Sequence, residues 1–455
     1  MDAHKSVDLE AGIRHWLINN IGSNIVAFEA MPGWRPAWNA TVETASGPLH
    51  LHVRGNRLLG QEITPLYQEY RVLKLFEDEG IPVPKIYGWC EEPEAIVMER
   101  VDNIPYHGGA DTDPKLHALV ADYMAIMARV HKIDLAKAKA AGLRVPETAH
   151  ETQFGYYNTH ETAYRAGKTG PEPMVEFMRR WILDNGPLHR NEKAVLIGDA
   201  PQFFHDGQRV THIFDLELVH IGDPIADLVS VWGRDINEPI GGLTEILLRY
   251  VAESGTQIDW PTFDFHALVY HIGAAMRVRP LLKADAILPA YSEYLSWDLS
   301  CSRAMLETFA RMLNIALEPV PTISPTPTDR AIALKNLVAA CRDLPAAGGR
   351  MREQPALSLA NYLQRVDEIG PEIERQTLAD ISHFLERPFA TLAEAEAELE
   401  RFVIAHGAAH RPALVRLFHR QIGRQLQLIQ DYPAPIVTRT PFIIDRSQFV
   451  EPTAH

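Results

Sequence analysis

The residues best suited to chemistry lie in the segment 197–228, which reads IGDAPQFFHDGQRVTHIFDLELVHIGDPIADL. Asp199 follows an apolar run, and Asp215 closes a second strand-like run. Between them, the Asp206-Gly207 pair predicts a hairpin turn. Two carboxylates at the ends of such elements can meet in one cleft, where one orients or accepts a proton and the other binds a metal ion. The alternative interpretation is that both aspartates only cap turns.

The elements that must position these carboxylates form two groups. The alternation Leu-His-Leu-His-Val at 49–53 is typical of a strand, and a stripe of Leu66, Tyr70 and Leu73 predicts a helix over 65–79. Further strands are predicted at 24–31, 37–44, 85–89 and 95–101, and a long helix at 115–131. Beyond that helix the pattern is mostly helical, apart from a β-rich stretch at 195–214. This order predicts an α+β body of two lobes with a cleft.

A proline-rich stretch, EPVPTISPTPTD at 318–329, separates this body from the rest of the chain. Proline fixes φ and removes backbone donors, so the stretch is predicted to be a stiff linker. Helical patterns follow at 331–344, 356–385 (with a break expected at Gly370-Pro371), 392–406 and 412–430. The sequence PAPIVTRTPFIID then predicts a non-helical arm that packs on something.

Composition excludes several classes of function. The chain has 455 residues, of which 46% are hydrophobic and 23% are charged, as in ordinary globular proteins. A formal net charge of −15 and the lack of a long basic run oppose binding to nucleic acid. No apolar run approaches the roughly 18 residues that a membrane helix needs. The N-terminal residues carry early acids and do not resemble a signal peptide.

The cysteines and histidines give no sign of a disulfide framework or a metal cage. Cys90, Cys301 and Cys341 are odd in number and scattered, which favours a reducing, cytoplasmic location. His50 and His52 share one face of their predicted strand, but no H-E-x-x-H motif or nearby third ligand accompanies them. Solvated or packed histidines are therefore favoured over a histidine metal site.

The segment 197–228 resembles the catalytic core of aminoglycoside phosphotransferases and choline kinase-like enzymes, which share the protein-kinase fold. That family's pattern runs H-G-D, a loop ending in Asn, an Asp-Gly hairpin, I-D-W-E and G-D-P-x-x-D-L. The matching stretches here are Gly198-Asp199, Asp206-Gly207, Phe214-Asp215-Leu216-Glu217 and Gly222-Asp223-Pro224-Ile225-Ala226-Asp227-Leu228. Weaker matches upstream are GWRPAWNAT at 33–41, Val53-Arg54, QEYRVL at 68–73 and VMERV at 97–101.

The resemblance implies a bilobal, protein-kinase-like fold followed by an all-α domain. Residues 1–101 would form a β-rich, nucleotide-binding N-lobe, and residues 102–317 a helical C-lobe with the catalytic loop. The linker 318–329 would lead to a helical accessory domain at 330–455, which ends in the extended arm.

The resemblance also implies the roles of individual residues. Asp199 would orient or accept the proton of a substrate hydroxyl, and Asp215 would hold Mg²⁺ against the phosphates of ATP. Arg54 would pair with those phosphates, supported by Glu69, as the Lys–Glu pair does in kinases. An arginine at this position has a planar guanidinium where lysine has a compact ammonium group, and the guanidinium can still contact a phosphate through two N–H groups. Asp227 would anchor the catalytic loop.

The other nucleotide contacts implied by the resemblance come from the N-lobe. The loop that carries Gly33 and Asn39 would cover the phosphates. Met98 and Glu99 would frame the adenine, mostly through backbone groups. Trp34, Pro36 and Trp38 are bulkier than a phosphate cradle favours, because glycine lets the backbone approach closely.

The catalytic loop departs from the family's pattern at two positions. Ile197 stands where the family has His, a residue that packs mainly as part of the core. Counting forward from Asp199 places the metal-binding Asn position at Phe204, which cannot bind Mg²⁺. Counting back from Asp215 places it at Gln202 in a loop two residues shorter, and we prefer this alignment. The carbonyl oxygen of Gln202 is a hard ligand that suits Mg²⁺.

The polar and aromatic segment 150–171 falls where the family varies its substrate-binding elements. Its candidate substrate contacts are Tyr156, Tyr157, His160 and Tyr164. Packing of a surface loop is the alternative interpretation. The helical tail resembles small accessory proteins encoded beside related kinases and is a candidate surface for homodimer formation.

The sequences of these motifs are most similar to those of one branch of the family, the kinases linked to acyl-CoA dehydrogenases. The kinases of this branch act on hydroxyacyl-CoA thioesters. The function implied is an ATP- and Mg²⁺-dependent phosphotransferase that acts on a hydroxyl of a small metabolite. An aminoglycoside is the second choice of acceptor. The negative charge of the chain favours a cationic aminoglycoside, but the similarity of the motifs does not. The alternatives are a degenerate pseudokinase that binds nucleotide or ligand, and a kinase fold that performs a non-phosphoryl reaction.

Overall fold

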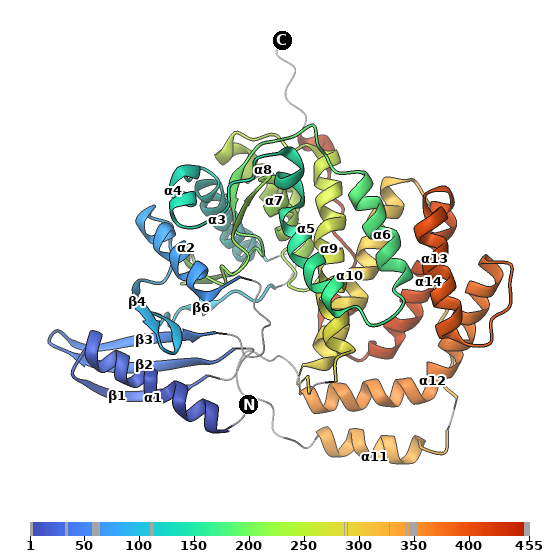
Figure 1. The fold of residues 1–455 in the computed structure, drawn as a ribbon, viewed down its shortest axis with the longest axis horizontal. Helices are drawn as coiled ribbons and strands as arrows, with labels where there is room; N and C mark the ends of the chain where they lie inside the picture. The colour runs from blue at the N-terminus through green and yellow to red at the C-terminus, as the bar shows by residue number, and fades with distance from the viewer. Residues whose placement is uncertain are drawn as a thin grey trace, which may run out of the picture.

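The computed structural model describes residues 3–31, 35–56, 64–109, 113–285, 287–288, 290–326, 328–342, 344 and 354–449. Gly33 and Trp34, which the sequence places in the loop over the phosphates, lie outside these residues. The chain forms a small β-rich lobe, a helical lobe and a helical tail (Figure 1). This architecture confirms the α+β, bilobal fold class that the sequence predicts.

The N-terminal lobe is built on one antiparallel sheet with the strand order β1-β2-β3-β5-β4. Leu51 and Val53 on one face pack with Ile13 and Leu17 of a helix at the N-terminus, whereas Arg54 lies on the opposite face. The strand and helix bounds are α1 (Ala3–Asn20), β1 (Asn24–Ala30), β2 (Ala37–Thr44), β3 (Gly47–Gly55), β4 (Ile86–Glu91) and β5 (Glu94–Glu99). The predicted strands are confirmed, but the sequence analysis did not anticipate α1.

Helix α2 (Leu66–Asp78) belongs to the core on the other face of the sheet. Its Phe76 is fully buried and clusters with Ile96 and Met98 of β5. These two strand residues pair across the ladder with Arg54 and His52 of β3, so they share the face of Arg54. The amphipathic stripe of α2 therefore holds the helix beside the strand that carries Arg54.

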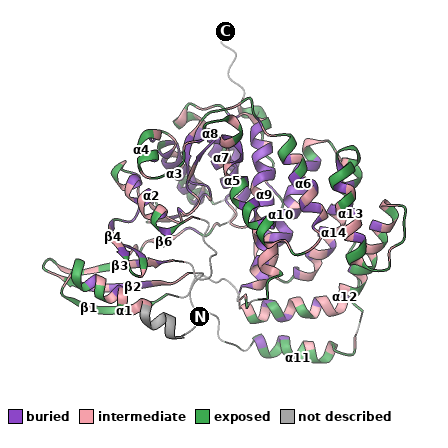
Figure 2. Cartoon of the chain, viewed as in Figure 1, coloured by how far each residue is buried: buried purple, intermediate pink, exposed green. Residues whose placement is uncertain are grey.

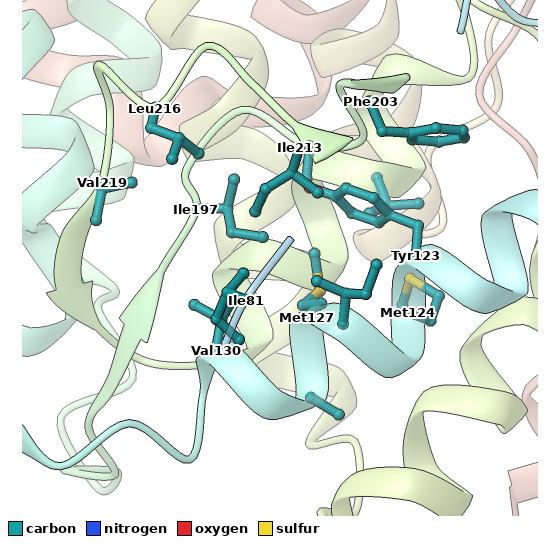
Figure 3. Close-up of a cluster of buried hydrophobic side chains, with 14 of the residues drawn as sticks. Ile81, Tyr123, Met124, Met127, Val130, Ile197, Phe203, Ile213, Leu216 and Val219 are labelled. Atoms are coloured by element: carbon teal, nitrogen blue, oxygen red, sulfur yellow. The ribbon is translucent and has the colours of Figure 1, made fainter. Parts of the chain in front are cut away.

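The helical lobe contains two small sheets, ordered β6-β8-β9 and β10-β7. Its elements are β6 (Ile104–Pro105), α3 (Pro114–Val130), α4 (Leu135–Ala140), α5 (Ala149–Gly167), α6 (Pro173–Asp184), β7 (Ala194–Leu196), β8 (Phe203–His205), β9 (Val210–Ile213), β10 (His220–Gly222), α7 (Ile225–Arg234), α8 (Leu243–Ser254), α9 (Trp260–Leu282) and α10 (Tyr291–Met312). Side chains from the loops around β8 and β9 face α3 in one buried cluster (Figure 3). Ile197 is 1% exposed within it, so the apolar residue at the family's His position serves the core.

Most of the polar segment 150–171 belongs to helix α5, which ends at Gly167, and is not the surface loop considered from the sequence. Thr148 accepts a hydrogen bond from the Glu151 N–H, and Glu151 accepts one from the Thr148 N–H, which forms a capping box at the start of α5. Tyr157 and Tyr164 are each 1% exposed. The aromatic residues that read as a polar insert therefore form the buried stripe of an ordinary helix.

The helical tail follows the predicted pattern closely. Its elements are α11 (Ala331–Arg342), α12 (Pro355–Phe384), α13 (Leu392–His406), η1 (Gly407–His410), α14 (Arg411–Leu426), η2 (Gln427–Ile429), η3 (Pro435–Val437) and η4 (Arg446–Phe449). The predicted break at Gly370-Pro371 is wrong, because α12 continues through Pro371. Ile369 and Ile373 on either side of the proline are buried with Ile323 of the linker. We attribute the continuity to this packing, which offsets the hydrogen bond that proline removes.

The tail and the helical lobe share one hydrophobic core. Buried side chains of α12, α13 and α14 cluster with those of α6, α9 and α10. By contrast, α11 buries only Val338 and Cys341 and is largely exposed (Figure 2). The division of the chain into separate domains at the linker remains a prediction. Within the described ranges, no helix combines the length and the apolar character that a bilayer crossing requires.

A group of ion pairs lies where the tail meets the helical lobe. Arg279 of α9 contacts Asp298 at 2.8 Å and also pairs with Glu172. Glu400 of α13 accepts hydrogen bonds from Lys168 and from the backbone N–H of Glu172. The Glu172 and Asp298 side chains are only 7% and 8% exposed. Asp298 therefore depends on Arg279 to offset its desolvation, and Glu172 depends on Arg279 together with Lys283.

Replacing Arg279 with methionine is expected to lower the free energy of unfolding by about 3–5 kcal/mol, because buried Asp298 loses its ion-pair partner and buried Glu172 keeps only Lys283. Urea denaturation of the full chain measures this loss. The matched control is Arg375→Ala, which removes an arginine that is 66% exposed from its pair with Glu372. That control is expected to change the free energy of unfolding by less than about 1 kcal/mol. Equal losses in the two variants would contradict the account.

Candidate active site

Arg54, Glu69 and Asp215 come together where the N-terminal sheet meets the helical lobe. Arg54 Nε lies 3.0 Å from Glu69 Oε1, and Arg54 Nη2 lies 2.7 Å from Asp215 Oδ1. Although burial lowers the pKa of the Arg54 guanidinium, the charges of Glu69 and Asp215 raise it overall. Three residues that the sequence assigned to phosphate and metal binding are thus in direct contact. The arginine is a permanent cation at the junction of the two lobes.

The backbone at Asp215 adopts a conformation that is uncommon for any residue except glycine. Its φ is +62°, in the left-handed region. Residues held in this region cluster at ligand-binding and catalytic sites, where the surrounding structure over-determines them. Asp215 follows β9, and its side chain remains 31% exposed. The strained turn therefore presents a carboxylate to solvent at the lobe junction.

Arg35 is a second cation at this place and was not singled out from the sequence. It precedes β2 and pairs with Glu217 of the helical lobe and, at 3.4 Å, with Glu69 of α2. Its side chain is only 11% exposed. Two arginines of the N-terminal lobe, Arg35 and Arg54, thus each form an ion pair with the loop that follows β9. The only sequence sign of Arg35 is its position in the GWRPAWNAT loop.

Asp199 lies in the loop between β7 and β8 and has its own cation. Arg234 Nη1 donates to Asp199 Oδ1 at 2.8 Å, and Gln202 Nε2 donates to Asp199 Oδ2 at 3.1 Å. Burial raises the pKa of the Asp199 carboxyl, and the charge of Arg234 opposes that shift. The charge of Asp215 also contributes to the raised pKa, so the two aspartates act on each other electrostatically. A carboxylate with a raised pKa is suited to accept a proton.

Residues on successive turns of helix α7 contact the loop that carries Asp199. Asp227 accepts hydrogen bonds from the N–H groups of Ile197 at 2.7 Å and Gly198 at 2.8 Å. Ser230 Oγ accepts the N–H of Ala200 at 3.2 Å. Arg234 completes the series through its contact with the Asp199 side chain. Residues at these spacings share one face of a helix, so α7 fixes the catalytic loop as a rigid support.

Asp227 is also held by a histidine of the helical lobe. His131 Nε2 lies 3.0 Å from Asp227 Oδ2, and His131 Nδ1 lies 2.7 Å from the Tyr250 hydroxyl. Asp227 is fully buried, so its hydrogen bonds to two loop N–H groups and to His131 are what offset its desolvation. This geometry agrees with the anchoring role that the resemblance implies for Asp227.

Two of the remaining predicted nucleotide residues, Asn39 and Met98, lie on the face of the sheet that carries Arg54. Asn39 Oδ1 lies 3.0 Å from His52 Nδ1, and Met98 pairs with His52 across the strands. Glu99 is at the end of β5, where its backbone N–H donates to the Lys85 carbonyl at 2.8 Å. Met98 is 6% exposed. The adenine contacts of Met98 and Glu99 remain a prediction, and the Glu99 N–H is already used by the sheet.

Helix α5 brings only part of its predicted substrate residues near Asp199. The charge of Asp199 contributes, after burial, to raising the pKa of Tyr156, and the Tyr156 ring stacks on Tyr270 with centroids 6.2 Å apart. His160 lies beside Tyr156, and burial lowers its pKa to about 3. Tyr157 and Tyr164 face the hydrophobic core instead. Their role as substrate contacts remains a prediction that their burial does not favour.

The carboxylates suit a magnesium ion that is shared with phosphates. The described residues contain no group of three or more His, Cys, Asp or Glu side chains that could hold a metal by themselves. Mg²⁺ is commonly held by one or two carboxylates together with substrate phosphates and water. Asp215, partly exposed and next to Arg54, fits such a partial site. Gln202 uses its amide nitrogen on Asp199, which leaves its carbonyl oxygen as the group for the predicted metal contact.

Comparison with known proteins agrees with this geometry. Residues 53–266, which include Arg54, Glu69, Asp199 and Asp215, match the model of a family described as the phosphotransferase enzyme family. We term this region the phosphotransferase-family domain after that match, which covers just under half of the chain. The match confirms the family resemblance stated from the sequence.

The chain also resembles part of a curated mouse protein, acyl-CoA dehydrogenase family member 10. The two are 28% identical over 183 residues, which cover 35% of this chain and 16% of the mouse protein. The similarity therefore concerns one segment of a much longer protein.

Two solved structures of phosphotransferases resemble the chain more distantly. A thermostable mutant of an aminoglycoside phosphotransferase, in a ternary complex with AMP-PNP and hygromycin B, covers 66% of this chain and 99% of its own length. It has a TM-score of 0.48 and 13% identity. An ethanolamine kinase of Plasmodium vivax covers 64% of this chain and 86% of its own, with a TM-score of 0.47 and 11% identity. Neither similarity is close enough to transfer the role of a residue.

Sequence reasoning missed two cations of the phosphotransferase-family domain and its surroundings, Arg35 and Arg234. Arg234 could have been found, because it lies seven residues after Asp227 and therefore shares a helical face with it. The partner of Arg35 could not have been found in this way. Arg35 and Glu217 are 182 positions apart, and no local pattern connects them.

Proposed function

We propose that this protein is an ATP- and Mg²⁺-dependent phosphotransferase that acts on a hydroxyl group of a small metabolite. The observation that carries the proposal is the pairing of each aspartate with a separate arginine, Asp199 with Arg234 and Asp215 with Arg54. Each carboxylate therefore has a distinct electrostatic environment. Membership of residues 53–266 in the phosphotransferase family supports the reaction class.

Asp199 is the proposed proton acceptor. It takes the proton of the acceptor hydroxyl as the hydroxyl oxygen bonds to the γ-phosphorus of ATP and the bond from that phosphorus to the ADP oxygen breaks. Its raised pKa supports this role, because a stronger base takes the proton more readily. Arg234 keeps enough of the carboxyl ionised and fixes its orientation. Helix α7 holds the loop still during the transfer.

Asp215 and Gln202 are the proposed Mg²⁺ ligands, and Arg54 and Arg35 the proposed phosphate contacts. A bound Mg²⁺ supplies positive charge against the phosphates and against the developing charge of the transition state. Arg54 and Arg35 each have a fork of N–H donors that matches phosphate oxygens. Glu69 orients both guanidiniums. Asn39, Met98, Glu99 and the undescribed Gly33 complete the proposed nucleotide contacts.

The proposed acceptor is a hydroxyacyl-CoA or a similar catabolic acid. Arg234 donates a hydrogen bond to the Asp199 carboxylate, and the charge of Arg277 acts to lower the pKa of Tyr156. Cations beside the reacting hydroxyl favour an acidic acceptor over a cationic aminoglycoside. The mouse relative is named as a member of an acyl-CoA dehydrogenase family, and this name supports the same choice. Tyr156 and His160 are the proposed contacts to the acceptor, with Tyr157 and Tyr164 behind them.

The test is transfer of the γ-phosphate from labelled ATP, with Mg²⁺, to a panel of hydroxy acids, their CoA thioesters and aminoglycosides. Label is expected on a hydroxyacyl-CoA or a hydroxy acid, and not in the Asp199→Asn or Asp215→Asn variants. Transfer to aminoglycosides alone would keep the reaction class and overturn the acceptor. Undiminished transfer by both variants would overturn the assignment of the two aspartates.

One observation favours a second candidate, a nucleotide-binding protein without transfer activity. Gln202 contacts Asp199, and Arg54 contacts Asp215, so both proposed metal ligands already have protein partners. ATP with Mg²⁺ would then raise the melting temperature, because a ligand that binds only the folded state stabilises it. No label would reach any acceptor in the panel.

Substitution of Arg234 predicts a change in the pH profile. In Arg234→Met, Asp199 loses the positive charge that opposes the effect of burial, so its pKa rises further above its usual range. The acid limb of kcat/KM therefore moves to higher pH, because Asp199 must be deprotonated to accept a proton. Arg234→Lys keeps the charge and is expected to leave the limb nearly in place. An acid limb at the same pH in Arg234→Met would contradict the role of Asp199.

A further inference from the structure

Residues 435–449, which we term the C-terminal arm, return from the helical tail to the helical lobe. Arg303 of α10 donates hydrogen bonds to three carbonyls of the arm, those of Ile436, Val437 and Arg439. Further along, Trp232 Nε1 of α7 donates to the Phe442 carbonyl at 2.8 Å. These bonds fix the path of the arm across α7. The arm lies outside the region that matches the phosphotransferase family.

The arm supplies the cation for a buried carboxylate at the end of α7. Arg439 Nε and Nη2 lie 3.0 and 2.7 Å from Asp235 Oδ2. Asp235 is 0% exposed. Its other oxygen accepts the N–H groups of Ile240 at 2.8 Å and Gly241 at 3.2 Å. Asp235 thus connects the arm to the loop between α7 and α8.

This loop leads directly to the catalytic carboxylate. Arg234, the neighbour of Asp235, is held between two acids, Asp199 at 2.8 Å and Glu238 at 2.9 Å. Glu238 belongs to the loop whose end is fixed by Asp235. The position of Arg234 therefore depends on a loop that the arm helps to hold. Arg439 contacts Asp235, and Asp235 holds the backbone of the loop that carries Glu238. Glu238 in turn contacts Arg234, which contacts Asp199.

We propose that Arg439 is a positioning residue for the transfer reaction, acting through Asp235 and Arg234 on the orientation of Asp199. This inference rests on the proposed function. A buried carboxylate without its cation must take up a proton, admit water or move. Any of these changes alters the hydrogen bonds that Asp235 accepts from the N–H groups of its loop. A small displacement of a catalytic group is enough to slow a reaction strongly.

The experiment compares Arg439→Ala with Arg446→Ala in the full chain. Arg446 lies on the same arm and pairs with Asp264, away from Asp235, so it controls for loosening of the arm. Arg439→Ala is expected to lower kcat by about 10- to 100-fold, the scale of a misplaced catalytic group. KM for ATP is expected to stay within about 2-fold, because the hydrogen bonds of the arm in the described part of the chain reach the helical lobe. Arg446→Ala is expected to keep the kcat of the unmodified protein.

A second measurement does not depend on activity. Amide hydrogen exchange of peptides that cover 197–204 and 234–242 is expected to be faster in Arg439→Ala than in Arg446→Ala. If Arg439→Ala does not fold, Arg439→Lys replaces it in both measurements. Lysine keeps the charge but loses the planar fork, so intermediate losses are expected.

The outcomes separate this inference from the proposed function. Absence of transfer by the unmodified protein overturns the proposed function, and exchange alone then decides whether the arm holds the catalytic loop. Equal exchange in the variants of Arg439 and Arg446 overturns the inference. Equal kcat in the two variants, in an active protein, also overturns it.

Discussion

Replacing Asp199 with asparagine is expected to lower kcat by about 10²- to 10⁴-fold, the range that a general base contributes. Asparagine has nearly the same shape and can still accept a hydrogen bond from Arg234, so the loop is expected to keep its structure. The variant cannot take the hydroxyl proton at neutral pH. KM for ATP is expected to change by less than about 3-fold, because the loss concerns only the transition state. Steady-state kinetics with the acceptor found in the transfer assay measure both constants.

The matched control for Asp199 is Asp206→Asn. Asp206 lies in the same stretch of chain, but its carboxylate accepts the N–H groups of Gln208 and Arg209 in an exposed turn. It is expected to leave kcat unchanged within about 2-fold. Equal losses in both variants would show that Asp199 only caps a turn, the alternative that the sequence leaves open.

Asp215→Asn is expected to lower kcat/KM by about 10³-fold, which corresponds to about 4 kcal/mol of lost metal-assisted stabilisation. The carboxylate charge that would hold Mg²⁺ is removed, and Arg54 loses one of its two carboxylate partners. Raising the Mg²⁺ concentration is expected to recover part of the rate, because a weakened site fills at higher concentration. The dependence of the initial rate on Mg²⁺ measures this shift.

Glu217→Gln serves as the comparison for Asp215→Asn. Glu217 is two residues further along and pairs with Arg35, so this variant also weakens an ion pair between the lobes. It is expected to raise KM for ATP without changing how the rate depends on Mg²⁺. An identical Mg²⁺ dependence in Asp215→Asn and the unmodified protein would contradict the assignment of the metal.

Much of the fold could be predicted because local patterns determine it. The alternation at 49–53 indicates a strand with Leu51 and Val53 on its buried face, and β3 has this arrangement. The proline at 371 was misinterpreted, because the burial of Ile369 and Ile373 depends on the linker residue Ile323. The surface-loop interpretation of the segment in α5 is also wrong, because the many polar residues of this helix mask a buried stripe. In both cases tertiary packing outweighed a local preference.

The candidate site was predictable only where a motif marks it. Asp199, Asp215 and Asp227 belong to a stretch whose order and spacing match the family's pattern, and the structure places all of them around one loop. Their arginine partners are different. Arg439 and Asp235 are 204 positions apart, and nothing in either local sequence indicates the contact. Such pairs follow from the folded geometry, so they can be assigned only after the fold is known.

The central claim is that Asp215 and Arg54 form a site for a nucleotide triphosphate with Mg²⁺. Calorimetric titration of a non-hydrolysable ATP analogue into the full chain, with Mg²⁺ or with EDTA, tests it most directly. The account predicts binding that is tighter with Mg²⁺ than with EDTA, and a loss of this difference in Asp215→Asn. Absence of binding in both conditions, or equal affinity with and without Mg²⁺ in the unmodified protein, would contradict it.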